Sequence, residues 1–327
     1  MYKRKIITER NSSDMYYHQI TYEWEDIFSE QLSIELKDSG MYRNSKGLDI
    51  IKEILSCPFK FQITKDNWNM AFVMFVRMSH RYKFKNVIPI YLDVHRRWVD
   101  KIISDTVRLP LFFVTSYDIY KIIQGRIKDE RCVYIPLSIS DIYYDIKKTL
   151  NKDIDVVQLG RKNMILHNYM KEYCQKNREI NYVYMENGVY VSTVGMAVNG
   201  LVSRKEYMDL LRRAKISLVS SPCVDKEKDF GEGVDFITPR FYESAVEYCH
   251  MAGRYTDNYE SQVLNISSVC PNIDTKEEFF ELIDKYLDLP NKRNVELYDD
   301  FIKSHLTSNI AQRVREKLTV RGIRVEE

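Results

Sequence analysis

Short apolar runs alternate with amphipathic helical stretches along the chain, which has 327 residues. The apolar runs predict strands at Lys5–Thr8, Val87–Leu92, Leu111–Thr115, Val133–Ile135, Val156–Leu159, Tyr182–Met185, Ile216–Ser220 and Gly253–Thr256. Phe59–Ile63 and Met70–Phe75 fit either strands or buried segments. Helical periodicity predicts helices at Trp24–Leu36, Leu48–Leu55, Met164–Gln175, Arg204–Arg213, Thr238–Cys249, a Thr275-capped stretch to Leu287, and Val295–Leu318. This alternation predicts an α/β fold with parallel sheets.

A charged seam divides the chain into two halves. A short apolar strand ends at Pro136-Leu137, and a charged stretch, Lys147–Asp155, leads into the next strand. We therefore expect two Rossmann-like domains, covering residues 1–150 and 151–300, with a ligand cleft between them. Neither half carries a G-x-G-x-x-G after its first strand, which disfavours a dinucleotide-dependent dehydrogenase.

Composition is that of an ordinary globular enzyme. Hydrophobic residues make up 44% and charged residues 29% of the chain. No apolar run approaches the ~18 residues that span a bilayer, and the basic start lacks the apolar core of a signal peptide. We therefore expect the protein to stay in the cytoplasm. The six cysteines form no C-x-x-C pair, so the sequence indicates neither a disulfide framework nor a zinc site.

Charge is unevenly distributed along a chain whose net charge is only +2. The segment Arg43–Lys101 holds 12 basic and 5 acidic residues, interleaved with aromatic ones. A solvated face is one interpretation, and contact with an anionic membrane or a lipid-diphosphate acceptor is another. Nucleic-acid binding is a third interpretation, but the sequence contains no nucleic-acid-binding motif. We therefore expect no nucleic-acid partner.

The candidate chemistry begins with a loop that runs into a helix, Asp235–Glu243, with the sequence D-F-I-T-P-R-F-Y-E. Thr238 can cap the helix, and Pro239 suits its first position. The free N–H groups and dipole of such a helix start attract phosphate. Arg240 opposes the dipole unless an anion binds there. The alternative is structural, with Arg240 and Glu243 forming a surface i,i+3 ion pair.

This stretch resembles the nucleotide-sugar half of GT-B glycosyltransferases, especially group-1-like enzymes with a T-P-R-[FY]-[FY]-E signature, including relatives of spore-maturation glycosyltransferases. The resemblance spans Asp155 to about Lys317 and is weaker over the first half. It implies that residues 301–327 include a helix that crosses back to the first domain. It also implies that Glu243 binds the donor ribose and that the first acid lies near the transferred sugar. That acid is Asp235, one methylene shorter than the family's glutamate.

The same resemblance gives a phosphate role to the turn Gly160-Arg161, which follows a predicted strand at its carboxyl end. Glycine there allows close approach of backbone to phosphate, and Arg161 supplies charge. The remaining donor-site residues are taken from the signature itself: Thr238, Pro239, Arg240 and Phe241. A strand-ending turn with a solvent-facing arginine is the structural alternative for Arg161.

Acceptor activation has weaker candidates. His18 follows the first strand, and Asp93 and His95 follow another strand end, so each could serve as a base if the enzyme inverts. A surface histidine and a turn-capping aspartate are the structural alternatives. A positively charged helix start can take the place of a metal, so we expect no metal and no cofactor beyond the nucleoside-diphosphate sugar itself, of UDP or GDP type.

These features predict a metal-independent glycosyltransferase that acts on a glycan, lipid-linked or protein acceptor in bacterial surface polysaccharide or glycoconjugate synthesis. A nucleotide-sugar 2-epimerase remains an alternative on the same fold. So does a catalytically inactive GT-B subunit that only binds, since Asp235 departs from the family's glutamate.

Overall fold

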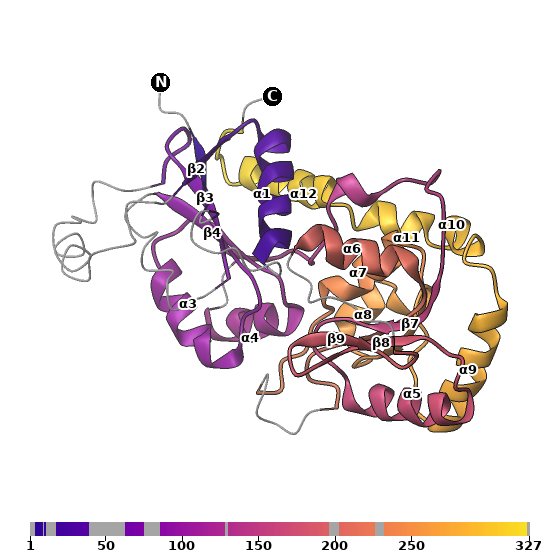
Figure 1. The fold of residues 1–327 in the computed structure, drawn as a ribbon. Coiled ribbons are helices and arrows are strands. Elements are labelled where there is room, and N and C mark those ends of the chain that lie inside the picture. Colours follow the sequence, from indigo (N-terminus) through magenta and orange to yellow (C-terminus); the bar gives the residue numbers. More distant parts are fainter. Residues whose placement is uncertain are drawn as a thin grey trace.

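The computed structural model describes residues 4–8, 10, 18–38, 63–74, 86–127, 130–195, 203–225 and 232–325. It shows two lobes, each built on its own sheet (Figure 1). The predicted helix Leu48–Leu55, most of Phe59–Ile63 and most of the basic segment Arg43–Lys101 up to residue 85 lie outside the described residues.

The first sheet is parallel, with strand order β2-β1-β3-β4-β5-β6. Its strands are β1 (Lys5–Thr8), β2 (Glu35–Asp38), β3 (Asn69–Val73), β4 (Val87–Tyr91), β5 (Phe112–Val114) and β6 (Cys132–Tyr134). The connecting helices are α1 (Gln19–Leu32), η5 (Arg96–Trp98), α3 (Val99–Thr106) and α4 (Tyr117–Ile127). All five residues of β4 are buried, as expected for a central parallel strand covered on both faces.

The second sheet has the order β11-β10-β7-β8-β9 and is parallel except for the β8–β9 pair. Its strands are β7 (Ile154–Gln158), β8 (Tyr182–Glu186), β9 (Val189–Ser192), β10 (Ala214–Ser220) and β11 (His250–Arg254). Its helices are α5 (Met164–Lys176), α6 (Arg204–Arg213), α7 (Pro239–Val246), α8 (Tyr259–Val263), η7 (Ile266–Ser268) and α9 (Lys276–Asp288). The predicted Thr275 cap is confirmed, since Thr275 and Glu278 form a complete capping box.

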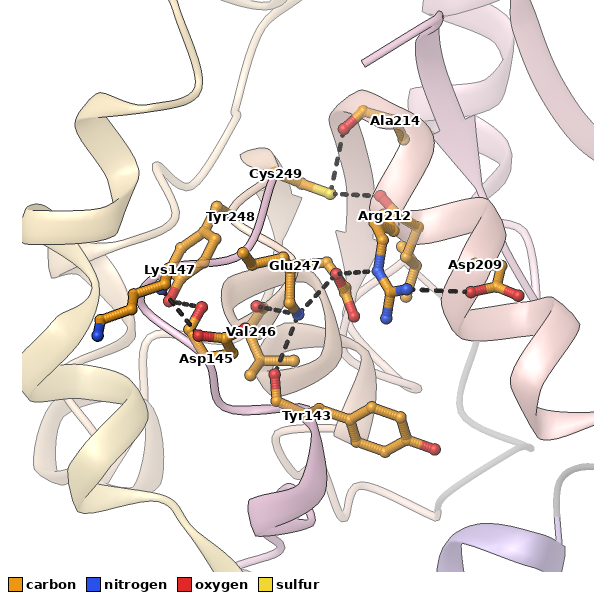
Figure 2. A network of polar contacts seen from close by, with 12 residues as sticks. Tyr143, Asp145, Lys147, Asp209, Arg212, Ala214, Val246, Glu247, Tyr248 and Cys249 are labelled. Carbon is orange, nitrogen blue, oxygen red and sulfur yellow. Dashed lines mark hydrogen bonds and ion pairs between the residues drawn. The ribbon is translucent and has the colours of Figure 1, made fainter. Parts of the chain in front are cut away.

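The connection between the lobes lies against the second one. It includes η6 (Asp141–Tyr143) and continues to Lys148, whose ammonium reaches Glu247 at the end of α7 (2.9 Å). Lys152 donates to the Glu247 carbonyl oxygen (2.7 Å). Figure 2 shows Glu247 in this region, bonded to Arg212 of α6. The linker is therefore fixed to the second domain by charged contacts.

The predicted helix Val295–Leu318 is wrong as a single element, because the chain forms α10 (Arg293–Leu297), α11 (Asp299–Ser304) and α12 (Thr307–Val320). The break before α12 lies where the chain crosses back to the first domain. There Ile139 donates to His305 O (3.0 Å) and accepts from Thr307 N (2.9 Å). Beyond the crossing, α12 lies alongside α1, as the resemblance implied (Figure 1).

Three further differences have local causes. The helix predicted to reach Leu36 ends at Leu32, because Ser33 adopts a left-handed conformation (φ 55°) and Ile34 N bonds Ser29 O, which frees the next residues for edge strand β2. Asn187 and Gly188, both with positive φ, turn the chain into the unpredicted β9. Cys249-His250 is not helical, since α7 ends at Val246 and His250 begins β11.

Candidate functional site

The turn after β7 brings together the two arginines that the sequence predicted to bind phosphate. Gly160 adopts a left-handed conformation (φ 69°), and its N–H donates to the Tyr190 hydroxyl (3.0 Å). Arg240 extends from the first turn of α7 to this loop, where its Nη1 donates to the carbonyl oxygens of Leu159 (3.3 Å) and Arg161 (2.8 Å). A Cβ at Gly160 would lie 3.4 Å from Arg240 Nη1, so the backbone and guanidinium are in close contact.

Arg240 is half-buried and forms no ion pair with any described residue; its partners are neutral carbonyl oxygens. The predicted alternative, a surface pair between Arg240 and Glu243, is therefore wrong. Partial burial and the neighbouring Arg240 charge both lower the pKa of the Arg161 guanidinium, whereas Asp93 and Cys223 raise it. Two like charges thus lie close together at a helix start, which favours binding of an anion.

The start of α7 differs from the prediction in one respect. Pro239 occupies the first helical position, as predicted, and Thr238 is the N-cap residue. The Thr238 side chain, however, does not cap the helix, because its hydroxyl points to Ser220 O (3.5 Å) instead. Phe241 is fully buried and packs edge-on against Tyr255, so only its backbone faces the helix mouth. The first-turn N–H groups are therefore not covered by the Thr238 side chain.

Asp235 is buried and fully hydrogen-bonded. Its Oδ2 accepts from the hydroxyls of Ser221 (2.5 Å) and Thr256 (2.6 Å). Its Oδ1 accepts from the backbone N–H groups of Cys223 (3.2 Å) and Phe236 (3.1 Å). Four bonds fill the acceptor capacity of a carboxylate. The residue therefore fixes the loop before α7.

Glu243 lies one turn into α7, with 3% of its surface exposed. Its Oε1 accepts from Arg204 Nη1 (2.6 Å), and its Oε2 accepts from the Tyr207 hydroxyl (2.7 Å). Each oxygen keeps one further acceptor position. A ligand would reach those positions only after the residues that cover them move.

The three candidate bases all come from the first domain. Asp93, with a left-handed backbone (φ 48°), is exposed just after β4, and its charge acts on Arg161 of the second domain. His95 is half-buried at the start of η5. His18 is half-buried at the start of α1 and is remote in sequence from both. Asp93 thus acts through its charge on one member of the arginine pair.

A second group of acids, which no sequence pattern indicated, lies at the seam between the lobes. Glu260 of α8 is buried and accepts from Tyr117 N (3.2 Å) and the Tyr134 hydroxyl (3.0 Å), both in the first domain. Burial raises its pKa to about 8, helped by the charges of Asp118 and Asp235 and opposed by those two donors. Asp118 also accepts from the backbone N–H of Asp235 (3.0 Å). These contacts join the domains close to the loop that precedes α7.

No model of a protein family matches the chain, and a search of curated proteins also found no match. Solved structures do match. AviGT4, a glycosyltransferase involved in avilamycin A biosynthesis, has a TM-score of 0.56 at 12% identity, covering 98% of this chain and 97% of that one. The DNA-modifying enzyme β-glucosyltransferase, solved with and without uridine diphosphoglucose, has a TM-score of 0.51 at 12% identity, covering 98% and 100%.

The fold is GT-B. The prediction of two Rossmann-like domains with a returning C-terminal helix is thereby confirmed. A putative UDP-N-acetylglucosamine 2-epimerase from Listeria monocytogenes matches over 100% of this chain and 99% of its own, with a TM-score of 0.52 at 11% identity. Some matched structures are longer: the chain spans 57% of TarM and 59% of the pneumococcal O-GlcNAc transferase GtfA. The boundaries at 150 and 300 stay predictions.

Two negative observations apply to the described residues. None of their helices is both long and apolar enough to cross a bilayer. No group of three or more His, Cys, Asp or Glu side chains among them is arranged to hold a metal ion.

Proposed function

We propose that this chain is a glycosyltransferase that moves a sugar from a nucleoside-diphosphate donor to a hydroxyl of a glycan, lipid-linked or protein acceptor. One observation carries the proposal: Arg161 and Arg240 lie together at the start of α7, and Arg240 has no acidic partner among the described residues. A diphosphate supplies the missing negative charge. The two guanidinium groups and the first-turn N–H groups of α7 then stabilise the leaving nucleotide without a metal.

In this proposal Glu243 holds the ribose, and Asp235 shapes the loop instead of contacting the sugar, because its acceptor capacity is filled. Asp93 is the preferred acceptor base, since it is exposed and acts on Arg161; His95 and His18 are the other candidates. The T-P-R-F-Y-E signature supports a place among spore-maturation-type enzymes of bacterial surface polysaccharide or glycoconjugate synthesis. A cytoplasmic location, with contact at an anionic membrane face, belongs to the same proposal.

Calorimetry with UDP, GDP, CMP and their sugar conjugates tests the donor site. The parent protein should prefer one base, and Arg240→Ala should weaken the nucleoside diphosphate by about 1.5–3 kcal/mol, roughly 10- to 150-fold, while sparing the free nucleoside. Arg213→Ala is a matched control, because Arg213 pairs with Asp153 elsewhere in the same domain. Equal binding of all ligands by parent and Arg240→Ala would refute the site.

Glu243→Gln tests the ribose contact separately. It should weaken nucleoside diphosphates much more than inorganic pyrophosphate, because only the nucleotide carries the ribose diol. Pyrophosphate weakened as much as UDP would show that Glu243 acts on the phosphate pocket.

A 2-epimerase is the second candidate, favoured by the full-length match to the Listeria monocytogenes structure. Incubation with a UDP-sugar alone distinguishes the two, since an epimerase converts its substrate without an acceptor. Tight donor binding with neither conversion nor transfer across acceptors would instead indicate a binding subunit.

A further inference from the structure

Arg204, the first residue of α6, lies between the two domains. Its side chain is 8% exposed and pairs with Glu243 of α7 through Nη1 (2.6 Å) and with Glu23 of α1 through Nε (3.3 Å). Its guanidinium also lies over the rings of Tyr143 in the linker and Tyr207 in its own helix (5.5 and 5.4 Å). One cation therefore contacts α1, the linker and α7.

The backbone of Arg204 also contacts α1. The N–H of Arg204 belongs to the first turn of α6, where helical N–H groups have no intrahelical acceptor. It donates to the side-chain oxygen of Gln19, the first residue of α1 (2.8 Å). If α1 moved away, the buried guanidinium of Arg204 would lose Glu23, and the backbone N–H of Arg204 would lose Gln19. Leaving buried polar groups without partners costs free energy.

Glu243 and Arg240 lie one turn apart on α7, so the contact that fixes Glu243 also fixes the position of the arginine pair. Figure 1 shows α6 and α7 side by side in the second lobe. Arg204 therefore connects α7 to the first domain through two ion pairs, one with Glu243 and one with Glu23. Guanidinium geometry suits this role, because its planar fork binds two carboxylates at once.

We propose that Arg204 is a positioning residue of the donor site, which links α7 to α1 so that donor binding at the α7 start orders the first domain. This inference rests on the proposed function. Arg204 contacts no reacting atom in it. It acts by holding Glu243 on one side and Glu23 on the other.

The test combines UDP titration with backbone hydrogen exchange of the full chain, with and without saturating UDP. In the parent, UDP should slow exchange in the first turns of both α6 and α1. Glu23→Gln removes the charge that pairs Arg204 with α1 but keeps the Arg204–Glu243 pair. It should bind UDP within about threefold of the parent and lose most of the protection of α1.

Arg204→Lys replaces the fork by a single point charge, and it should lose at least about tenfold in UDP affinity as well as the protection of α1. Arg213→Met is the matched control: Arg213 lies on the same helix, and its ion pair with Asp153 is exposed and lies within the second domain. It should behave like the parent.

The outcomes separate the two hypotheses. If UDP binds the parent and protects α1 equally in Glu23→Gln, the link is refuted and the donor site stands. Loss of that protection in Arg213→Met would refute the link in the same way. Failure of UDP and its relatives to bind the parent refutes the donor site itself, and the link with it.

Discussion

The charged side chains at the two ends of α7 differ in their partners. At its carboxyl end Glu247, with none of its surface exposed, accepts from Lys148 (2.9 Å) and from Arg212 (3.4 Å; Figure 2). Lys152 donates to its carbonyl oxygen. At its amino end Arg240 bonds only neutral carbonyl oxygens and lies beside a second arginine. The carboxylate at the carboxyl end thus has cationic partners, whereas Arg240 at the amino end has no acidic partner in the part of the chain that the structure describes.

This contrast distinguishes a structural charge from one available to a ligand. Cations near a helix carboxyl end are favourable, whereas cations at the amino end oppose the helix dipole. The Glu247 cluster follows the favourable arrangement and fixes the linker. The Arg240 cluster departs from it, as expected where function sets the residue type.

The largest expected effect is that of Lys148→Met at the carboxyl end of α7. Removing this cation leaves the fully buried Glu247 with weaker compensation, and we expect a loss of about 3–5 kcal/mol in the free energy of unfolding. Denaturant titration measures it. Lys147→Met, one residue earlier and exposed, should stay within about 0.5 kcal/mol of the parent. Equal stability of the two variants would contradict a structural role for the cluster.

Glu260 is an intermediate case, a buried carboxylate with two neutral donors and, among the described residues, no cation in ion-pair contact. Its pKa of about 8 in the folded state lies above the unfolded value, so the native protein retains a proton that the unfolded chain releases. Its stabilising contribution is complete below about pH 4.5 and is lost as the pH rises towards about 8.

Glu260→Gln should therefore flatten the fall in stability across that range, by up to roughly 1.4 kcal/mol per pH unit. Unfolding titrations at about pH 5, 6.5 and 8 measure the slope. Parallel curves for the variant and the parent would show that Glu260 does not titrate there.

Gly160→Ala tests the amino end of α7, where Arg240 lies. The left-handed backbone (φ 69°) strains any side chain by about 1–2 kcal/mol, and the new Cβ would lie in van der Waals contact with Arg240 Nη1 at 3.4 Å. We expect UDP affinity to fall about tenfold, because relief of the strain shifts the turn whose carbonyl oxygens hold Arg240. Gly188→Ala has similar strain (φ 83°) in the β8–β9 turn with open space around it, and it should leave UDP binding unchanged.

The smallest expected effect concerns the helix starts. Thr275 caps α9 through a complete capping box, whereas Thr238 makes no capping bond at the start of α7. Thr275→Ala should cost about 1 kcal/mol and Thr238→Ala less than about 0.5 kcal/mol. Thermal unfolding of the two single variants compares them, and a larger loss for Thr238→Ala would indicate that its hydroxyl caps the helix after all.

Sequence was sufficient for features set by local pattern. The strand–helix alternation, the Pro239 start and the rule that strands present ligands at their carboxyl ends placed Gly160, Arg161 and Arg240 at one site. The Asn187-Gly188 hairpin signal was also present in the sequence. These features depend on spacing within one element or turn.

Partners that come from distant elements could not be predicted in this way. Nothing local indicates that Glu243 bonds Arg204 and Tyr207, which precede it by more than 30 residues. The saturation of Asp235 depends on Ser221 and Thr256 from other strand ends. The break before α12 has neither Gly nor Pro; it results from the contact with Ile139.

The return of α12 has a consequence for the order of synthesis. Ile310 of α12 packs with Trp24 and Phe28 of α1 around a small apolar cavity, so the first domain has a piece of its core near the end of the chain. A ribosome makes α1 before the whole second sheet and α12 after it. The second domain can therefore fold during translation, while the apolar face of α1 waits for α12 and needs protection from aggregation until it arrives.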